Sequence, residues 1–175
     1  MRDLAGADRI QRFMESLGAA ARDEARVYLT GGASAVLLGW RGQTIDVAAS
    51  IVPERDELLR AIPRLKEELG INVELASPAD FIPELPDWEA RSRFIQQVGK
   101  LSFHHYDFYA QALSKIERGH VQDRADVATM LAHGLIEPRR LRELFDAISE
   151  RLYRYPAIDP PSFRRALDEA LADRA

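Results

Sequence analysis

RVYLTGGASAVLLGWRGQTIDVAAS, residues 26–50, predicts a strand, a turn, a short helix and a second strand in close succession. Apolar residues alternate with other residues over 27–29 and again over 44–48, which is the period-2 pattern of strands. The small and apolar residues between them predict a helix over 34–38. This stretch therefore favours a fold that mixes strands with helices.

Two glycines, Gly31 and Gly32, lie between the first predicted strand and the predicted helix. Because neither has a Cβ, a phosphate group can approach the backbone N–H groups at the positive end of the helix. The hydroxyl of Ser34 lies close to this turn in the sequence. These three residues are candidate phosphate ligands, although a glycine pair between a strand and a helix is also ordinary turn chemistry.

Apolar periodicity predicts four further elements in residues 1–105. In chain order they are a helix over 7–17, a helix over 53–69, and strands over 71–77 and 99–103. The proline-rich residues 78–90 are expected to form an ordered loop.

Residues 106–175 show helical periodicity only. The predicted helices cover residues 106–119, 122–134, 137–152 and 161–171. We therefore expect an α+β fold with a small mixed sheet and helices in residues 1–105, followed by an α-helical bundle in residues 106–175. A chain of 175 residues suits one compact unit, with the bundle packed on the core.

Composition excludes several classes of protein. Zero cysteines exclude disulfides, thiolate zinc sites and cysteine nucleophiles. No apolar run has the length of a membrane span or of a signal peptide, so we expect a cytoplasmic protein with no membrane partner. A formal net charge of −4 gives no overall attraction to nucleic acid. The glycine-rich and nucleophile motifs of P-loop NTPases, serine hydrolases and dinucleotide-binding enzymes are absent from the sequence.

Two carboxylates lie on successive predicted strands, Asp46 in the second and Glu74 in the third. Two strands joined by a helix normally lie parallel with a right-handed crossover, so these side chains are expected to project from neighbouring strands. Mg²⁺ commonly uses one or two protein carboxylates together with water and substrate phosphates, so the pair could hold one ion. The alternative for each residue is an ordinary strand carboxylate that faces solvent.

The order of a Gly-Gly turn, a helix, a strand aspartate and a carboxylate on a later strand resembles the nucleotidyltransferase fold of the polymerase-beta type. The nearest subgroup is the AbiEii-like abortive-infection nucleotidyltransferases, whose later helices carry a lysine, then an arginine, then a pair of acids. The residues in this order here are Lys115, Arg118, Asp123 and Asp126. The resemblance covers about residues 26–130.

The resemblance implies a nucleotidyltransferase core that uses Mg²⁺ to move a nucleoside monophosphate from a nucleoside triphosphate onto an acceptor hydroxyl. It implies metal ligands at Asp46 and Glu74, with Lys115 as a further catalytic residue. The implied substrate-binding residues are Gly31, Gly32, Ser34, Lys115, Arg118, Asp123 and Asp126. It also implies a bacterial, toxin-like protein acting on tRNA or another RNA, beside a cognate antitoxin protein.

Ala48 departs from the family's pattern, in which the second strand carries Asp-x-Asp. The chain is then either an active enzyme with an incomplete carboxylate set, or an impaired or disarmed protein of this fold that binds a nucleotide or a partner protein. Replacement of a native carboxylate by alanine to disarm a toxin would give the same sequence. Lys115 and Arg118 have a structural alternative as well, since they could pair with the acids that follow them in a surface charge lattice. Such exposed pairs contribute only about 0–1 kcal/mol each.

Overall fold

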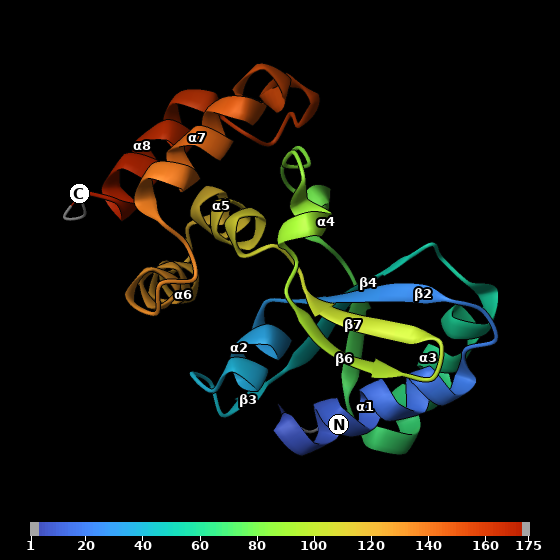
Figure 1. Cartoon of the computed structure of the whole chain (residues 1–175). Helices are drawn as coiled ribbons and strands as arrows, with labels where there is room; N and C mark the ends of the chain where they lie inside the picture. The colour runs from blue at the N-terminus through green and yellow to red at the C-terminus, as the bar shows by residue number, and fades with distance from the viewer. Residues whose placement is uncertain (1–3, 173–175) are drawn as a thin grey trace. The chain divides into compact units, whose positions relative to one another are not determined.

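The computed structural model describes residues 4–172, which form a mixed α+β protein (Figure 1). These residues divide into two compact units. The first contains residues 4–77 and 92–106, and the second contains residues 78–91 and 107–172. The helical part of the second unit begins near the boundary that the sequence predicts. The proline-rich segment 78–91, by contrast, belongs with the helices although it interrupts the first unit in the sequence.

A five-stranded mixed sheet forms the centre of the first unit, with the strands in the order β5-β4-β2-β7-β6. The strands are β2 (Ala25–Thr30), β4 (Asp46–Val52), β5 (Asn72–Leu75), β6 (Phe94–Val98) and β7 (Leu101–His105). Strand β2 is antiparallel to β4 and parallel to β7, and β6 is antiparallel to β7. Strands β4 and β5 are parallel, which confirms the arrangement predicted for two strands joined by a helix. The two-residue strands β1 (Ala5–Gly6) and β3 (Gln43–Thr44) form a separate antiparallel pair.

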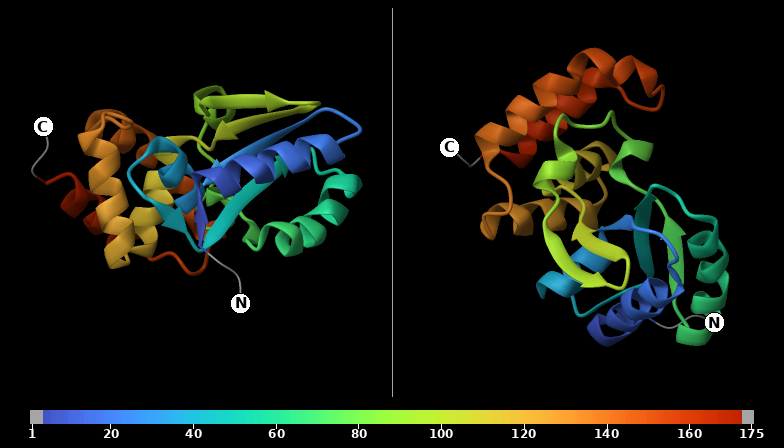
Figure 2. Two further views of the ribbon diagram at one scale, coloured as in Figure 1. Left: turned by 90° about the horizontal axis from the view of Figure 1, so that it is seen from below. Right: turned by 45° about the vertical axis from the view of Figure 1, so that its right-hand side comes forward.

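One face of the sheet contributes to the hydrophobic core together with helices α1 (Ala7–Ala20) and α3 (Asp56–Leu69), which lie side by side (Figures 1 and 2). The buried face of α1 is the stripe that the sequence predicts. Its residues are Ile10, Phe13, Met14 and Leu17. Every second residue of the central strands enters the same core: Val27, Leu29, Val47, Ala49, Ile51, Leu101 and Phe103. The residues between them therefore belong to the opposite face of the sheet.

Three of the element boundaries that differ from the prediction have a local structural reason. Helix α2 (Gly32–Leu38) begins earlier than predicted, because Gly31 is its N-cap. Strand β4 begins at Asp46, because the preceding Ile45 is 70% exposed and lies outside both β3 and β4. Helix α3 begins only at Asp56, so Pro53 lies before it rather than in its first turn.

The sequence does not predict β6, because its residues FIQQV lack a regular alternation. The pairing of β6 with β7 shifts register between Phe94 and Gln96, as at a β-bulge. Ile95 packs against the core, and the Gln96 amide also approaches the Met14 sulfur from the same side. Two consecutive residues on one side break the period-2 signal. Strand β7 begins at Leu101, after Gly99 has turned the chain at a φ of 56°.

Helices make up the second unit. They are α4 (Trp88–Arg91), α5 (Phe108–Arg118), α6 (Val121–Ala132), α7 (Pro138–Ile148) and α8 (Pro160–Ala170), with the 3₁₀ helices η1 (Pro78–Asp80) and η2 (Ser149–Arg154). The four helices predicted for this region are confirmed, except that the last part of the third is η2. Within residues 4–172, no helix combines the length and the apolar character needed to cross a membrane.

Contacts within the second unit hold segment 78–91 to the helices. The Tyr155 hydroxyl donates to the Ala79 carbonyl at 2.9 Å. The Arg91 guanidinium donates to both carboxylate oxygens of Asp107, the N-cap of α5. This carboxylate is almost fully buried, with 1% of its side chain exposed. The sequence-based boundary near residue 105 assigns this segment to the sheet-containing part, but polar contacts fix it to the helices.

Candidate functional site

The β4–β5 ladder places the two predicted metal ligands on one face of the sheet. Asp46 lies opposite Asn72, and Ala48 lies opposite Glu74. Residues two apart in a strand share a face, and so do directly paired residues of neighbouring strands. The intervening Val47 enters the core, so these four side chains belong to the face opposite the core. The sequence-based expectation that the two carboxylates project from neighbouring strands agrees with this register.

Asn72 is a member of this polar group that the sequence analysis did not select. Its side-chain amide donates a hydrogen bond to Oδ1 of Asp46. The bond orients the Asp46 carboxylate, while Glu74 is exposed. Strand alternation alone puts Asn72 on the same face as Glu74, so the signal that could have found it was present in the sequence.

Ala48 occupies the centre of the group. It pairs with Glu74 on one side and with Thr30 of β2 on the other. From strand dimensions, the Cα atoms of Asp46 and Glu74 lie roughly 8 Å apart across the diagonal. Carboxylates at this separation can reach one ion between them, whereas the methyl group of Ala48 supplies no oxygen.

Each of the two glycines before α2 is required by a different feature of the local structure. Gly31 has a φ of 62° and a ψ of −130°, a conformation that favours glycine. At Gly32, an added Cβ would lie 2.0 Å from Oγ1 of Thr44, so a side chain there would overlap with β3. The local structure therefore requires both glycines whether or not a phosphate binds, and the predicted phosphate contact stays a prediction.

The Ser34 side chain is buried, with its residue 1% exposed. Its hydroxyl donates to the Leu29 carbonyl at 3.1 Å and lies 3.0 Å from Nδ1 of His105. Because a carbonyl can only accept, the hydroxyl proton goes to Leu29 and His105 donates its Nδ1–H to the Ser34 oxygen. Ser34 was expected to contact phosphate; in the structure its hydroxyl joins α2 to the two central strands, and we leave it out of the proposed site.

The imidazole of His105 is neutral at physiological pH. Burial, together with the positive charge of Arg93 and the nearby His104, lowers the pKa of His105 to about 4. A neutral ring with Nδ1 protonated matches its hydrogen bond to Ser34. His105 is absent from the predicted site, because no pattern in the sequence pairs it with Ser34.

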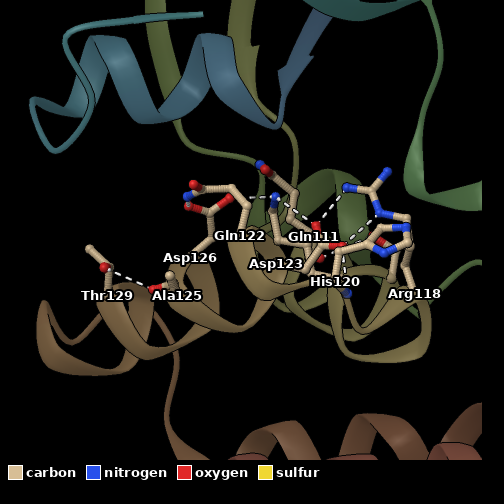
Figure 3. A network of polar contacts seen from close by, with 10 residues as sticks. Gln111, Arg118, His120, Gln122, Asp123, Ala125, Asp126 and Thr129 are labelled. Atoms are coloured by element: carbon tan, nitrogen blue, oxygen red, sulfur yellow. Dashed lines mark hydrogen bonds and ion pairs between the residues drawn. The ribbon is translucent and has the colours of Figure 1, made fainter.

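The predicted residues of the second unit form a largely buried network of ion pairs (Figure 3). The Lys115 ammonium lies 2.8 Å from Oδ2 of Asp126 and 3.7 Å from Oδ1 of Asp123. The Arg118 guanidinium donates to both oxygens of Asp123, at 2.6 and 2.8 Å. The exposed fractions of the Lys115, Asp123 and Asp126 side chains are 9%, 3% and 5%. The predicted charge lattice is therefore formed, with Lys115 and the two acids buried and the Arg118 side chain 50% exposed.

Helical spacing brings the network together. Lys115 and Arg118 lie one turn apart on α5, and the two acids lie one turn apart on α6. Asp123 also accepts the backbone N–H of His120, the N-cap of α6. Burial alone would raise the pKa of the Asp123 carboxyl, but the hydrogen bond and charge of Arg118 and the charge of Lys115 outweigh it, so that its pKa lies below its ordinary value. The Gln122 amide donates to the other acid, Asp126, at 2.9 Å.

No protein-family model, curated protein or solved structure matches this chain. Among the residues that the structure describes, no group of three or more histidines, aspartates and glutamates could hold a metal ion. The predicted magnesium site therefore rests on two carboxylates, Asp46 and Glu74.

Proposed function

We propose that the chain is a Mg²⁺-dependent nucleotidyltransferase that moves a nucleoside monophosphate from a nucleoside triphosphate to an acceptor hydroxyl. The observation that carries the proposal is the register of β4 and β5, with Asp46 and Glu74 on one face of adjacent parallel strands. Carboxylate oxygens are the ligands that Mg²⁺ prefers in proteins. The same proposal includes an RNA such as tRNA as the acceptor and a cognate antitoxin protein as a partner.

Each residue of the sheet group then has a part in binding. Asp46 and Glu74 would hold Mg²⁺, and Asn72 fixes the orientation of the Asp46 carboxylate. When bound, the ion would neutralise the triphosphate and favour the ionised form of the acceptor hydroxyl. Gly31 and Gly32 would offer backbone N–H groups to the phosphates.

Lys115 and Arg118 belong to the second unit, and their role as triphosphate-binding cations rests on the family resemblance alone. Both are already bound to Asp123 and Asp126 in the structure, so a phosphate would have to compete with these carboxylates. The network therefore holds the lysine and the arginine in place before any substrate arrives, and its structural contribution does not depend on catalysis.

A second candidate function is supported by Ala48. A methyl group lies between Asp46 and Glu74 at the position where a further carboxylate would complete a two-metal site. The chain would then be a disarmed protein of the same fold that binds a nucleotide or a partner protein without transferring a nucleotidyl group.

Transfer of label from each of the four NTPs to total RNA in the presence of Mg²⁺ distinguishes the two. We expect transfer by the wild-type protein, loss of transfer in Asp46→Asn, and unchanged transfer in the exposed control Asp23→Asn. If Ala48→Asp transfers label and the wild-type protein does not, the result would support the second candidate, a disarmed protein of the same fold. Transfer by neither wild type nor Ala48→Asp would refute the enzyme for RNA acceptors.

A further inference from the structure

A cleft in the second unit lies between segment 78–91 and the end of η2. Its volume is about 370 Å³, which is within the range of small-molecule sites. The lining residues are Ala79, Pro83, Glu84, Arg151, Arg154 and Tyr155, and we refer to it as the η2 cleft. None of them belongs to the site proposed above.

Two hydrogen bonds build the walls of the η2 cleft. The Tyr155 hydroxyl donates to the Ala79 carbonyl at 2.9 Å, and the Arg151 guanidinium donates to the Glu84 carbonyl at 3.3 Å. Both bonds join the proline-rich segment to the chain around η2. The phenolic proton of Tyr155 is used in this contact, so the guanidinium groups are the side-chain donors that remain for a ligand.

Arg151 and Arg154 lie on the same side of η2, because side chains three residues apart eclipse one another in a 3₁₀ helix. The Arg154 guanidinium lies over the ring of the exposed Tyr153, 5.7 Å from its centroid. Among the described residues, neither arginine forms an ion pair with a carboxylate. Other arginines of this unit, such as Arg91, Arg118 and Arg142, are paired with acids.

Two guanidinium groups without carboxylate partners repel one another when they share a cleft, and an anion between them removes this repulsion. A guanidinium fork matches the oxygens of phosphate and carboxylate groups in a bidentate manner. A phosphate group carries enough oxygens for both forks at once. We infer that the η2 cleft binds the phosphate groups of a small anionic ligand, and this inference does not depend on nucleotidyl transfer.

Isothermal titration calorimetry with inorganic pyrophosphate, at low ionic strength and with EDTA, tests the inference. Without a divalent cation, Asp46 and Glu74 repel the anion, and any binding at the other residues of the nucleotidyltransferase proposal would stay unchanged in Arg154→Gln. We expect the wild-type protein to bind pyrophosphate, and Arg154→Gln to weaken binding about tenfold or more. Arg154→Lys keeps the charge but loses the fork and should have an intermediate effect. Arg154 is exposed, so these substitutions are not expected to impair folding.

Arg139→Gln is the matched control, because Arg139 is an exposed arginine of the same unit that does not line the η2 cleft. Its affinity should stay within about twofold of the wild type, which separates the cleft from a general charge effect. Equal affinity of Arg154→Gln and wild type, or no binding by the wild type, would overturn the inference. Equal binding of citrate would overturn the choice of phosphate. An unphosphorylated single-stranded oligoribonucleotide that binds through Arg154 while pyrophosphate does not would overturn the choice of a small ligand.

Discussion

At the scale of single residues, the chain places ionised groups in two different settings. Asp46 and Glu74 lie on one face of the sheet, and Glu74 is exposed there. Lys115 and its acidic partners, in contrast, are buried. Buried charges are costly to leave without a partner, and exposed pairs contribute little. An ion pair at a buried position therefore has a different consequence for stability from one at an exposed position.

Replacing Lys115 by methionine tests this difference. Lys115→Met removes the ammonium from the buried Asp126 carboxylate, and we expect a loss of about 3–5 kcal/mol in the free energy of unfolding. Arg64→Ala, which breaks the exposed Arg64–Glu68 pair, should cost less than about 1 kcal/mol. Urea unfolding of both variants measures the difference. Removing both charges in Lys115→Met with Asp126→Leu should cost less than the single change, and a larger loss would contradict this account.

At the scale of elements, hydrogen bonds between side chains and backbone connect the short helix α2 to the sheet. Ser34 of α2 binds the end of β2 through the Leu29 carbonyl and the end of β7 through His105. Helix α2 spans only residues 32–38, so its own backbone bonds give it little independent stability. Its position therefore depends on this contact and on the packing of Gly32 against β3.

The contact at His105 predicts a pH dependence of stability. Its pKa is lowered to about 4 in the folded protein, compared with 6.5 in an unfolded chain, so the unfolded state binds more protons between these values. Stability contributed by this residue is then complete above pH 6.5 and is lost as the pH falls toward 4, by up to about 3 kcal/mol.

Unfolding with urea at several pH values measures this dependence. We expect His105→Gln to reduce the slope of stability against pH between 6.5 and 4, whereas the exposed control His133→Gln should keep the wild-type slope. An unchanged slope in His105→Gln would show that the imidazole is not held neutral by its surroundings.

At the scale of the whole molecule, each of the two units is built from two separate stretches of the chain. Segment 78–91 leaves the first unit after β5, joins the helices, and the chain then returns at residue 92 to form β6 and β7. The ion pair between Arg91 and the buried Asp107 is a link within the second unit at the end of this segment. Segment 78–91 also forms one wall of the η2 cleft.

Breaking this link should loosen the segment. Arg91→Ala leaves the Asp107 carboxylate buried without its guanidinium partner and removes the bond to the Pro86 carbonyl. Because Arg91 is 20% exposed, we expect a cost near the lower end of the range of about 3–5 kcal/mol for buried pairs. Hydrogen exchange should become faster in residues 78–91, and Arg140→Ala should leave the exchange of that segment unchanged.

Local patterns were enough to predict most elements. The stripe on α1, the alternation in β2 and β5, and the glycine after α5 are each encoded within a few neighbouring residues, so they can be recognised without knowledge of the fold. Strand β6 was not predicted, because its bulge breaks the alternation of residues by which a strand is recognised in a sequence. Some strands begin at a different residue from the predicted one, because their pairing depends on distant residues. Thr44, for example, pairs with Ala5.

The sequence by itself determined the α+β class, the order of most strands and helices, and the candidate carboxylates Asp46 and Glu74. Only the tertiary structure decided that Asn72 holds Asp46, that Ser34 is bound to His105, and that Lys115 is buried against Asp126. It also decided that Arg151 and Arg154 line one cleft with a segment far away in the sequence. The physical reason is that periodicity arises from neighbours along the chain, whereas burial, pairing and pKa depend on groups that folding brings together.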